Sequence, residues 1–344
     1  MIAGIFTGNY GTVKGSGKAS GPAIVAFNLA KALNKSGDLE FKMHVNSEID
    51  PRCEQPNVER LQRQHFDKGY LDQFDVIHVV SSKDIALGLS DLGYKPIIGT
   101  NVVFDVPNPE GVKLKDRKRL QSIINQEVEI GERGWGLALV PNVNLVGLHA
   151  KRLGLPLEKV LVFPCGIDTD YFSPSDVKRD SIVWVGPGEK KGEEIVTKLA
   201  AYYPDEKWIF KGKDGPYDYF DHVKDLQRAK VYISASKAET QGIATMEALA
   251  AGAPLILARH KYDSSDGKGY VEKDPPYCTE AGFVVGRNIN DFKVALDLLL
   301  SDQSLREEMS KTGRKYILDN FGLGQMAENY KKLLLYFTRD LRQN

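Results

Sequence analysis

Short apolar runs alternate with longer amphipathic segments along the whole of this 344-residue chain. Ile2–Thr7 has the continuous apolar character of a buried strand, and a Gly-rich loop follows it. The pattern over Pro22–Lys35 then predicts an amphipathic helix, with proline in its first turn and Gly37 as its stop. Strands buried on both faces appear as such apolar runs, so the alternation predicts parallel sheets covered by helices.

The same two patterns recur to the end of the chain. Further strands are predicted at Phe41–Asn46, Val76–Val80, Pro96–Val103, Gly136–Val140, Val160–Phe163, Ser181–Val185, Trp208–Lys211, Val231–Ala235, Pro254–Ala258 and Gly282–Val285. Further helices are predicted at Asp84–Leu92, Leu120–Trp135, Val143–Leu153, Glu193–Tyr202, Tyr219–Arg228, Gly242–Ala251, Asp291–Leu300, Ser304–Asn320 and Gln325–Leu341.

A stretch rich in Pro, Gly, Asp and Ser, residues 164–180, separates two such alternating series. We therefore expect two doubly wound α/β domains, one over 1–168 with a returning helix at about 325–344, and one over 175–322. Ligands of such sheets bind beyond the carboxyl ends of the strands, so the expected site is the cleft between the domains.

Composition narrows the functional classes. Lys plus Arg equals Asp plus Glu at 46 each, so the basic excess typical of nucleic-acid-binding proteins is absent. The three cysteines are isolated in sequence, which favours a reducing, cytoplasmic setting over a disulfide framework or a zinc site. No apolar run approaches the roughly 20 residues that span a bilayer. A basic run at 113–119 is either a solvated face, the favoured interpretation, or a weak peripheral contact with anionic lipid.

The Gly-rich loop after the first strand is not a standard nucleotide-binding motif. Thr12 stands where a P-loop needs its first glycine, and Ala19 replaces the hydroxyl residue that binds magnesium. Gly15, Gly17 and Gly21 are spaced one residue too widely for a dinucleotide fingerprint. Two interpretations stay open: a turn whose backbone amides approach phosphate, or a flexible surface loop.

Residues 234–254 carry the strongest chemical signal. A strand ends near Ala235, a loop carries Glu239, and a helix begins at Gly242 with Glu247 inside it. Side chains lean toward the start of a helix, so the Glu247 carboxylate reaches back toward any group held there. A free helix start binds anions, and a carboxylate accepts two hydrogen bonds from a diol. The alternative is that both glutamates are solvated, which the apolar neighbours of Glu247 disfavour.

This segment resembles the Glu, seven residues, Glu motif of the family-4 retaining glycosyltransferases, of the glycosyl transferases group 1, which have the GT-B fold. Glu239 and Glu247 match the two ends of the motif. Other stretches resemble the family in the same order: Phe74–Val79, Phe163–Phe172, Val185–Gly192 and Ala281–Val285.

The resemblance implies a GT-B fold, in which two Rossmann-like domains face each other across a cleft and the C-terminal helix crosses back to the first domain. It implies retaining transfer of a hexosyl-type sugar from a nucleoside-diphosphate sugar to a glycan, lipid-linked or small-molecule acceptor. Neither a cofactor nor a divalent metal is expected. Glu247 would bind the ribose, Glu239 the donor sugar, and Lys191 the diphosphate. The remaining donor-binding positions would be Gly21, Gly186, Gly242, Ile243 and Ala244.

Two positions depart from the family pattern. Pro187 stands where arginine is usual, which leaves Lys190 as the candidate for the missing charge. The region after Pro96–Val103 lacks the usual histidine, so Asn101 and Asp105 are the acceptor-side candidates. Two alternatives therefore remain: a nucleotide-sugar epimerase or phosphorylase on the same fold, or a non-catalytic nucleotide-sugar-binding module.

Overall fold

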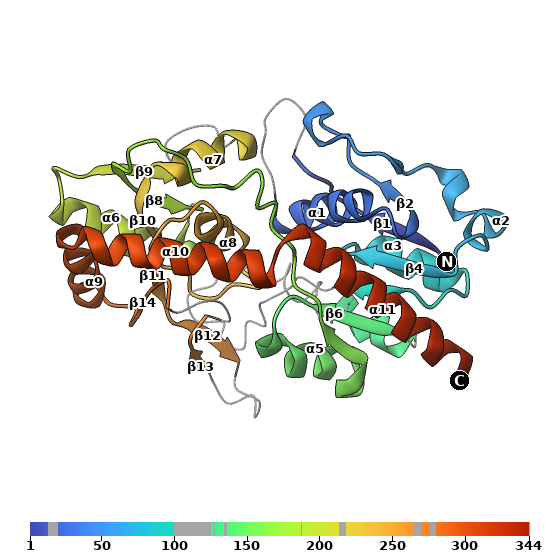
Figure 1. Ribbon diagram of the computed structural model, residues 1–344. Coiled ribbons are helices and arrows are strands. Elements are labelled where there is room, and N and C mark those ends of the chain that lie inside the picture. The colour runs from blue at the N-terminus through green and yellow to red at the C-terminus, as the bar shows by residue number, and fades with distance from the viewer. Residues whose placement is uncertain are drawn as a thin grey trace.

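Two parallel β-sheets, each covered by helices, form the two halves of the molecule in the computed structural model (Figure 1). The structure describes residues 1–12, 20–99, 125–126, 128–133, 136–186, 188–212, 218–263, 270–275 and 280–343. We refer to the half with the first sheet as the first domain and to the half with the second sheet as the second domain.

The first sheet has seven strands in the order β3-β2-β1-β4-β5-β6-β7. These strands are β1 (Ile2–Thr7), β2 (Glu40–Val45), β3 (Val58–Arg60), β4 (Val76–Val80), β5 (Ile97–Gly99), β6 (Leu137–Val140) and β7 (Val160–Val162). The second sheet has five strands in the order β14-β11-β10-β8-β9. They are β8 (Ser181–Val185), β9 (Lys207–Lys211), β10 (Ala229–Ser234), β11 (Leu255–Ala258) and β14 (Gly282–Val285). In each sheet the strands are added first to one side of the starting strand and then to the other, so each sheet is doubly wound.

Helices connect these strands. They are α1 (Gly21–Ser36), α2 (Lys68–Leu71), α3 (Lys83–Asp91), α5 (Val146–Leu153), α6 (Glu193–Tyr202), α7 (Tyr219–Gln227), α8 (Ile243–Ala250), α9 (Ile289–Ser301), α10 (Gln303–Asn320) and α11 (Leu323–Gln343). Short 3₁₀ turns include η1 (Pro51–Cys53), η2 (Arg63–Phe66) and η5 (Glu189–Lys191). Proline in the first turn of α1 and Gly37 at its end, with φ of 69°, act as the sequence predicts.

Most predicted elements are confirmed to within a residue or two at each end. β3 and the antiparallel pair β12 (His260–Asp263) and β13 (Tyr270–Lys273) were not predicted from the sequence. These strands are short and have polar residues at both odd and even positions, so they lack the apolar run that identified the others. Parts of the predicted elements Pro96–Val103 and Leu120–Trp135 lie outside the described residues.

The last helix returns to the first domain, as the resemblance implied. Figure 1 shows α11 leaving the second domain and lying along the first, where it packs against α1. Leu334 and Phe337 are buried in the core of the first sheet. The Tyr330 hydroxyl lies 3.0 Å from Nδ1 of His78, which burial holds in its neutral form with a pKa of about 3. His78 is therefore a core residue.

The chain crosses between the domains at residues 163–180. Asp168 forms an ion pair with Lys31 of α1, and Asp170 forms another with Lys35 at 2.7 Å. The Ile167 amide donates to the Phe321 carbonyl at 2.6 Å, which joins the outgoing and returning crossings. The two aspartates thus attach this crossing segment, which we call the hinge, to α1 through lysines.

Candidate functional site

Loops that follow three strands meet at the carboxyl end of the second sheet. The φ of Gly192 is +76°, and a Cβ there would lie 2.2 Å from the Ala235 carbonyl oxygen. Arg287, just beyond β14, donates to that same oxygen at 2.5 Å. The Lys237 amide donates to the Lys190 carbonyl at 2.8 Å. The loop after β8 is therefore held against the loop after β10 by backbone contacts that only glycine permits.

Lys191 and Glu239 lie together in this arrangement. The lysine Nζ is 2.5 Å from Oε1 of Glu239, and the Ser236 hydroxyl donates to the same oxygen at 2.7 Å. The Glu239 side chain is 14% exposed and that of Lys191 is 39% exposed, so one side of the pair remains accessible. Gly186 has a φ of +100° and lies against the Lys191 stem. The neighbouring Lys190 side chain is exposed.

The start of α8 is open, as a site for a phosphate requires. Gly242 precedes the helix in the left-handed conformation with φ of 73°, and no side chain caps the helix. Among the described residues, the amides of Ile243 and Ala244 donate to no acceptor. No acidic side chain lies in the first turn, so nothing there opposes an anion.

Glu247 is a core residue of the second domain. It is 2% exposed, and the Tyr219 hydroxyl donates to its Oε1 at 2.8 Å. Nε2 of His222 lies 3.9 Å from its other oxygen. Burial raises the pKa of this carboxyl to about 8, although the bond from Tyr219 acts in the opposite direction. The alternative that Glu247 is solvated is wrong, and a carboxyl with so perturbed a pKa is typical of functional sites.

The first domain approaches this site from the other side. The Asn142 side chain donates to the Thr240 carbonyl. Gln241 exchanges two hydrogen bonds with the Cys165 backbone, at 2.7 and 2.8 Å, and Ile24 of α1 packs in a core cluster of the second domain. Gln241 and Tyr219 were not predicted as site residues, because their importance depends on contacts with residues far away in the sequence.

Several predicted site residues are not tested by these contacts. Gly21 lies at the exposed start of α1. Asn101, Asp105 and Pro187 lie outside the described residues, as do most of the Gly-rich loop and the basic run at 113–119. The roles expected for all of these remain predictions.

Among the described residues, one group of side chains lies close enough together to hold a metal ion: His44, Glu59 and His65. Nδ1 of His65 accepts a hydrogen bond from the Gln62 amide at 3.1 Å, so the neutral ring carries its hydrogen on Nε2. That Nε2 is the atom that faces Glu59, at 3.7 Å. The group therefore lacks the three free lone pairs that a metal site requires, and it packs as a polar cluster formed by β2, β3 and η2.

The family model "Glycosyl transferases group 1" matches residues 181–316. The structure of sucrose-phosphate synthase from Thermosynechococcus elongatus is similar, with a TM-score of 0.72 and 16% sequence identity over 99% of this chain and 100% of that chain. Anabaena Alr3699/HepE in complex with UDP-glucose gives 0.68 and 12%, over 97% of this chain and 99% of the other. WaaG, a glycosyltransferase involved in lipopolysaccharide biosynthesis, gives 0.63 and 12%, over 96% and 99%. No curated protein sequence matches the chain.

These comparisons confirm the GT-B fold over nearly the whole chain and the resemblance to group 1 glycosyltransferases. The region that matches the family model contains the loops after β8 and β10 and the start of α8, where the site is assembled. Across the described ranges, no helix combines the length and apolar character needed to cross a membrane.

Proposed function

We propose that this chain is a retaining glycosyltransferase that transfers a hexosyl sugar from a nucleoside-diphosphate sugar to an acceptor hydroxyl, without a divalent metal. The observation that carries the proposal is the grouping of the Lys191–Glu239 pair, the open start of α8 and buried Glu247 at the carboxyl end of one sheet. A family match over the same residues and a structural neighbour solved with UDP-glucose support it.

Each part of this group suits one part of such a donor. The free amides of Ile243 and Ala244 would receive a phosphate, and Glu247 would accept hydrogen bonds from the ribose hydroxyls. Glu239 would contact the donor sugar. Lys191 carries three ammonium hydrogens, so it can keep its bond to Glu239 while it donates to the diphosphate.

The resemblance to retaining glycosyltransferases implies a front-face reaction. The bond between the anomeric carbon and the phosphate oxygen breaks while the acceptor oxygen attacks the same face of the sugar. The acceptor proton passes to the departing diphosphate. Negative charge grows on the leaving oxygen, and Lys191 with the α8 amides would stabilise it, an effect worth about 3 to 4 kcal/mol per well-placed donor in comparable sites.

The acceptor is proposed to be a glycan, a lipid-linked sugar or a small molecule that binds on the first domain, with Asn101 and Asp105 as candidates. The domain limits of 1–168 with 325–344, and 175–322, belong to this proposal. A cytoplasmic location, with weak peripheral contact between residues 113–119 and anionic lipid, is also proposed.

A donor screen followed by kinetics tests the proposal. Thermal shifts with UDP-glucose, GDP-mannose and ADP-glucose identify the donor, because a bound ligand stabilises the fold by mass action. Turnover is then measured for the wild type and for Glu247→Ala and Lys191→Ala, with and without EDTA, and NMR gives the anomeric configuration of the product. Lys198→Ala is the control, since this lysine is exposed on α6 and pairs with Glu194.

Both site variants are expected to lose donor binding or turnover, while the control and the EDTA-treated enzyme keep them. Wild-type kinetics in both site variants would contradict the proposal. Epimerised or phosphorolysed donor without acceptor would favour another enzyme on the same fold. Tight binding without turnover on any acceptor would favour a binding module.

A further inference from the structure

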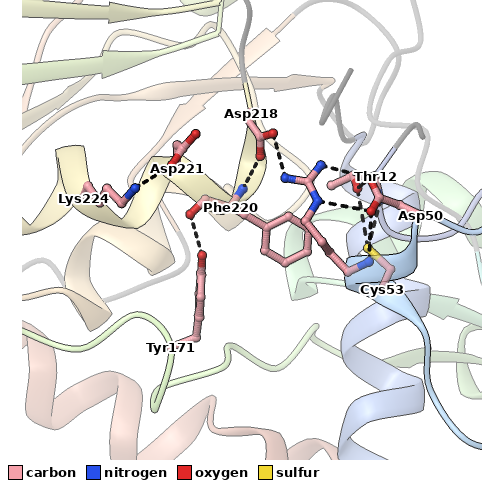
Figure 2. Close-up of polar contacts among 9 residues, drawn as sticks. Thr12, Asp50, Cys53, Tyr171, Asp218, Phe220, Asp221 and Lys224 are labelled. Atoms are coloured by element: carbon pink, nitrogen blue, oxygen red, sulfur yellow. Dashed lines mark hydrogen bonds and ion pairs between the residues drawn. The ribbon is translucent and has the colours of Figure 1, made fainter. Parts of the chain in front are cut away.

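Arg52 joins the two domains through an ion pair with Asp218. Figure 2 shows Asp218 and Phe220 of the second domain next to Asp50 and Thr12 of the first. Arg52 lies in the turn η1 of the first domain, and its Nη1 is 2.8 Å from Oδ2 of Asp218 in the second domain. Its guanidinium also lies over the Phe220 ring, 4.7 Å from the ring centre. The two partners in the second domain are the residue before α7 and the second residue of that helix.

The first domain holds Arg52 in place through Asp50. Nη2 and Nε of the arginine contact the two oxygens of Asp50 at 2.9 and 3.1 Å, and the aspartate is 3% exposed. These bonds lower the pKa of Asp50 to about 2. The Thr12 hydroxyl donates to Asp50 at 2.9 Å, and Thr12 is the last described residue before the Gly-rich loop. The bridge thus begins at the base of that loop.

The second domain receives the bridge at the first turn of α7. Oδ1 of Asp218 caps the helix by accepting the Phe220 amide at 2.8 Å, which leaves Oδ2 for Arg52. The Tyr171 hydroxyl, from the hinge, donates to the Phe220 carbonyl at 2.5 Å. Contacts from the first domain and from the hinge therefore converge on a single helical turn.

That turn also carries Tyr219, which points the other way. Tyr219 is 4% exposed and donates to Glu247, the residue proposed to bind ribose. Asp218, Tyr219 and Phe220 are consecutive, so a displacement of the bridge displaces the phenol that holds the carboxylate. The contacts are continuous from the base of the Gly-rich loop, through Arg52, to Glu247.

We propose that Arg52 is a positioning residue for the nucleotide donor: it fixes the first turn of α7 when the domains are closed, and through Tyr219 it holds Glu247 in place for the ribose. This inference rests on the proposed function. Within the described part of the chain, the side chain of Arg52 contacts Asp50, Asp218 and Phe220 and forms no hydrogen bond or ion pair with Lys191, Glu239 or Glu247, so its effect is expected on donor affinity rather than on the chemical step.

Asp218→Asn is the sharpest test, because asparagine retains the capping oxygen and loses the charge. Arg52→Gln breaks the bridge from the other side, and Lys224→Ala is the control, since it removes an exposed ion pair one turn along the same helix. The bridge is partly exposed, at 43% for Arg52 and 27% for Asp218. Each single variant is therefore expected to weaken donor binding about twofold to fivefold, the range of exposed ion pairs.

The double variant tests whether Arg52 and Asp218 affect donor binding through their shared ion pair. Arg52→Gln with Asp218→Asn is expected to weaken binding no more than the stronger single variant, because both remove one interaction. The assay is calorimetric titration with whichever of UDP, GDP and ADP stabilises the wild type, together with donor KM and kcat. In the single and double variants, KM for the donor is expected to rise while kcat changes by less than twofold. In a protein that already carries Tyr219→Phe, adding Asp218→Asn is expected to weaken donor binding no further.

The inference would be overturned if Asp218→Asn changed donor affinity no more than Lys224→Ala does. It would also be overturned if the losses of affinity in the two single variants multiplied in the double variant. It would equally be overturned if kcat fell while KM held. These outcomes are separable from failure of the proposed function. If Glu247→Ala and Lys191→Ala both keep wild-type nucleotide binding and turnover, the proposed function fails. If only Glu247→Ala loses binding, the positioning role of Arg52 fails alone.

Discussion

Replacing Glu247 with glutamine is expected to make the second domain more stable near neutral pH while it impairs donor binding. The variant retains an oxygen that accepts the Tyr219 hydrogen bond but has no charge to bury. Burial raises the pKa of the carboxyl from 4.5 to about 8, so the folded state binds the proton more tightly than the unfolded state. The wild type therefore loses stability as pH rises above 4.5, until the pH passes about 8.

The size of the effect follows from the interval between the two pKa values. Each pH unit of that interval changes the free energy of unfolding by about 1.4 kcal/mol. At pH 7, which is about 2.5 units above the pKa of 4.5, Glu247→Gln is therefore expected to be about 3 kcal/mol more stable than the wild type. Chemical unfolding of the wild type and Glu247→Gln at pH 5, 6, 7 and 8 measures the difference. The gain is expected to be small at pH 5 and to increase steadily to pH 8.

Glu194→Gln is the matched control, because Glu194 is exposed on α6 and pairs with Lys198, one turn away. Its stability difference is expected to change little over this pH range. A difference for Glu247→Gln that stays constant between pH 5 and 8, or one that is destabilising throughout, would refute the reasoning that burial keeps this carboxyl from ionising.

Four further outcomes are expected. Donor affinity should rise from pH 6 to 8, by at most about tenfold per unit, since ribose hydroxyls donate to ionised Glu247; titration with a nucleotide sugar at three pH values checks this, and a flat profile contradicts it. Gly192→Ala should lower thermal stability and turnover together, because φ of +76° and a carbonyl 2.2 Å from the new Cβ both oppose it; a variant with wild-type melting and rate would show that the loops can separate. Tyr330→Phe should cost about 1 to 2 kcal/mol of unfolding free energy by leaving Nδ1 of buried His78 unpaired, and no loss in chemical unfolding would mean that water replaces the phenol. Sedimentation with anionic vesicles should detect weak binding that salt abolishes if residues 113–119 contact lipid, and equal binding at high salt would exclude an electrostatic contact.

The sequence allowed two parts of this molecule to be predicted well. Apolar runs of strand length and the helix signals at Pro22 and Gly37 depend on neighbours in the chain, so they predicted the two sheets and the bounds of α1 closely. The spacing of Glu239 and Glu247 around a helix start is likewise local. β3 and the pair β12–β13 were missed because a short polar strand is stabilised by its partner strand rather than by its own apolar pattern.

Only the tertiary structure could decide which of these residues meet. The ion pair of Lys191 with Glu239 depends on β8 and β10 lying side by side, since adjacent parallel strands deliver their following loops to one edge. The burial of Glu247 under Tyr219, and the bridge from Arg52 to Asp218, join residues that are 28 and 166 positions apart. Contacts over such separations depend on strand order and domain packing, which local periodicity in the sequence does not predict. The sequence by itself therefore determined most of the elements and the candidate motif, whereas tertiary packing determined the charge state of Glu247 and the partners of the residues in the motif.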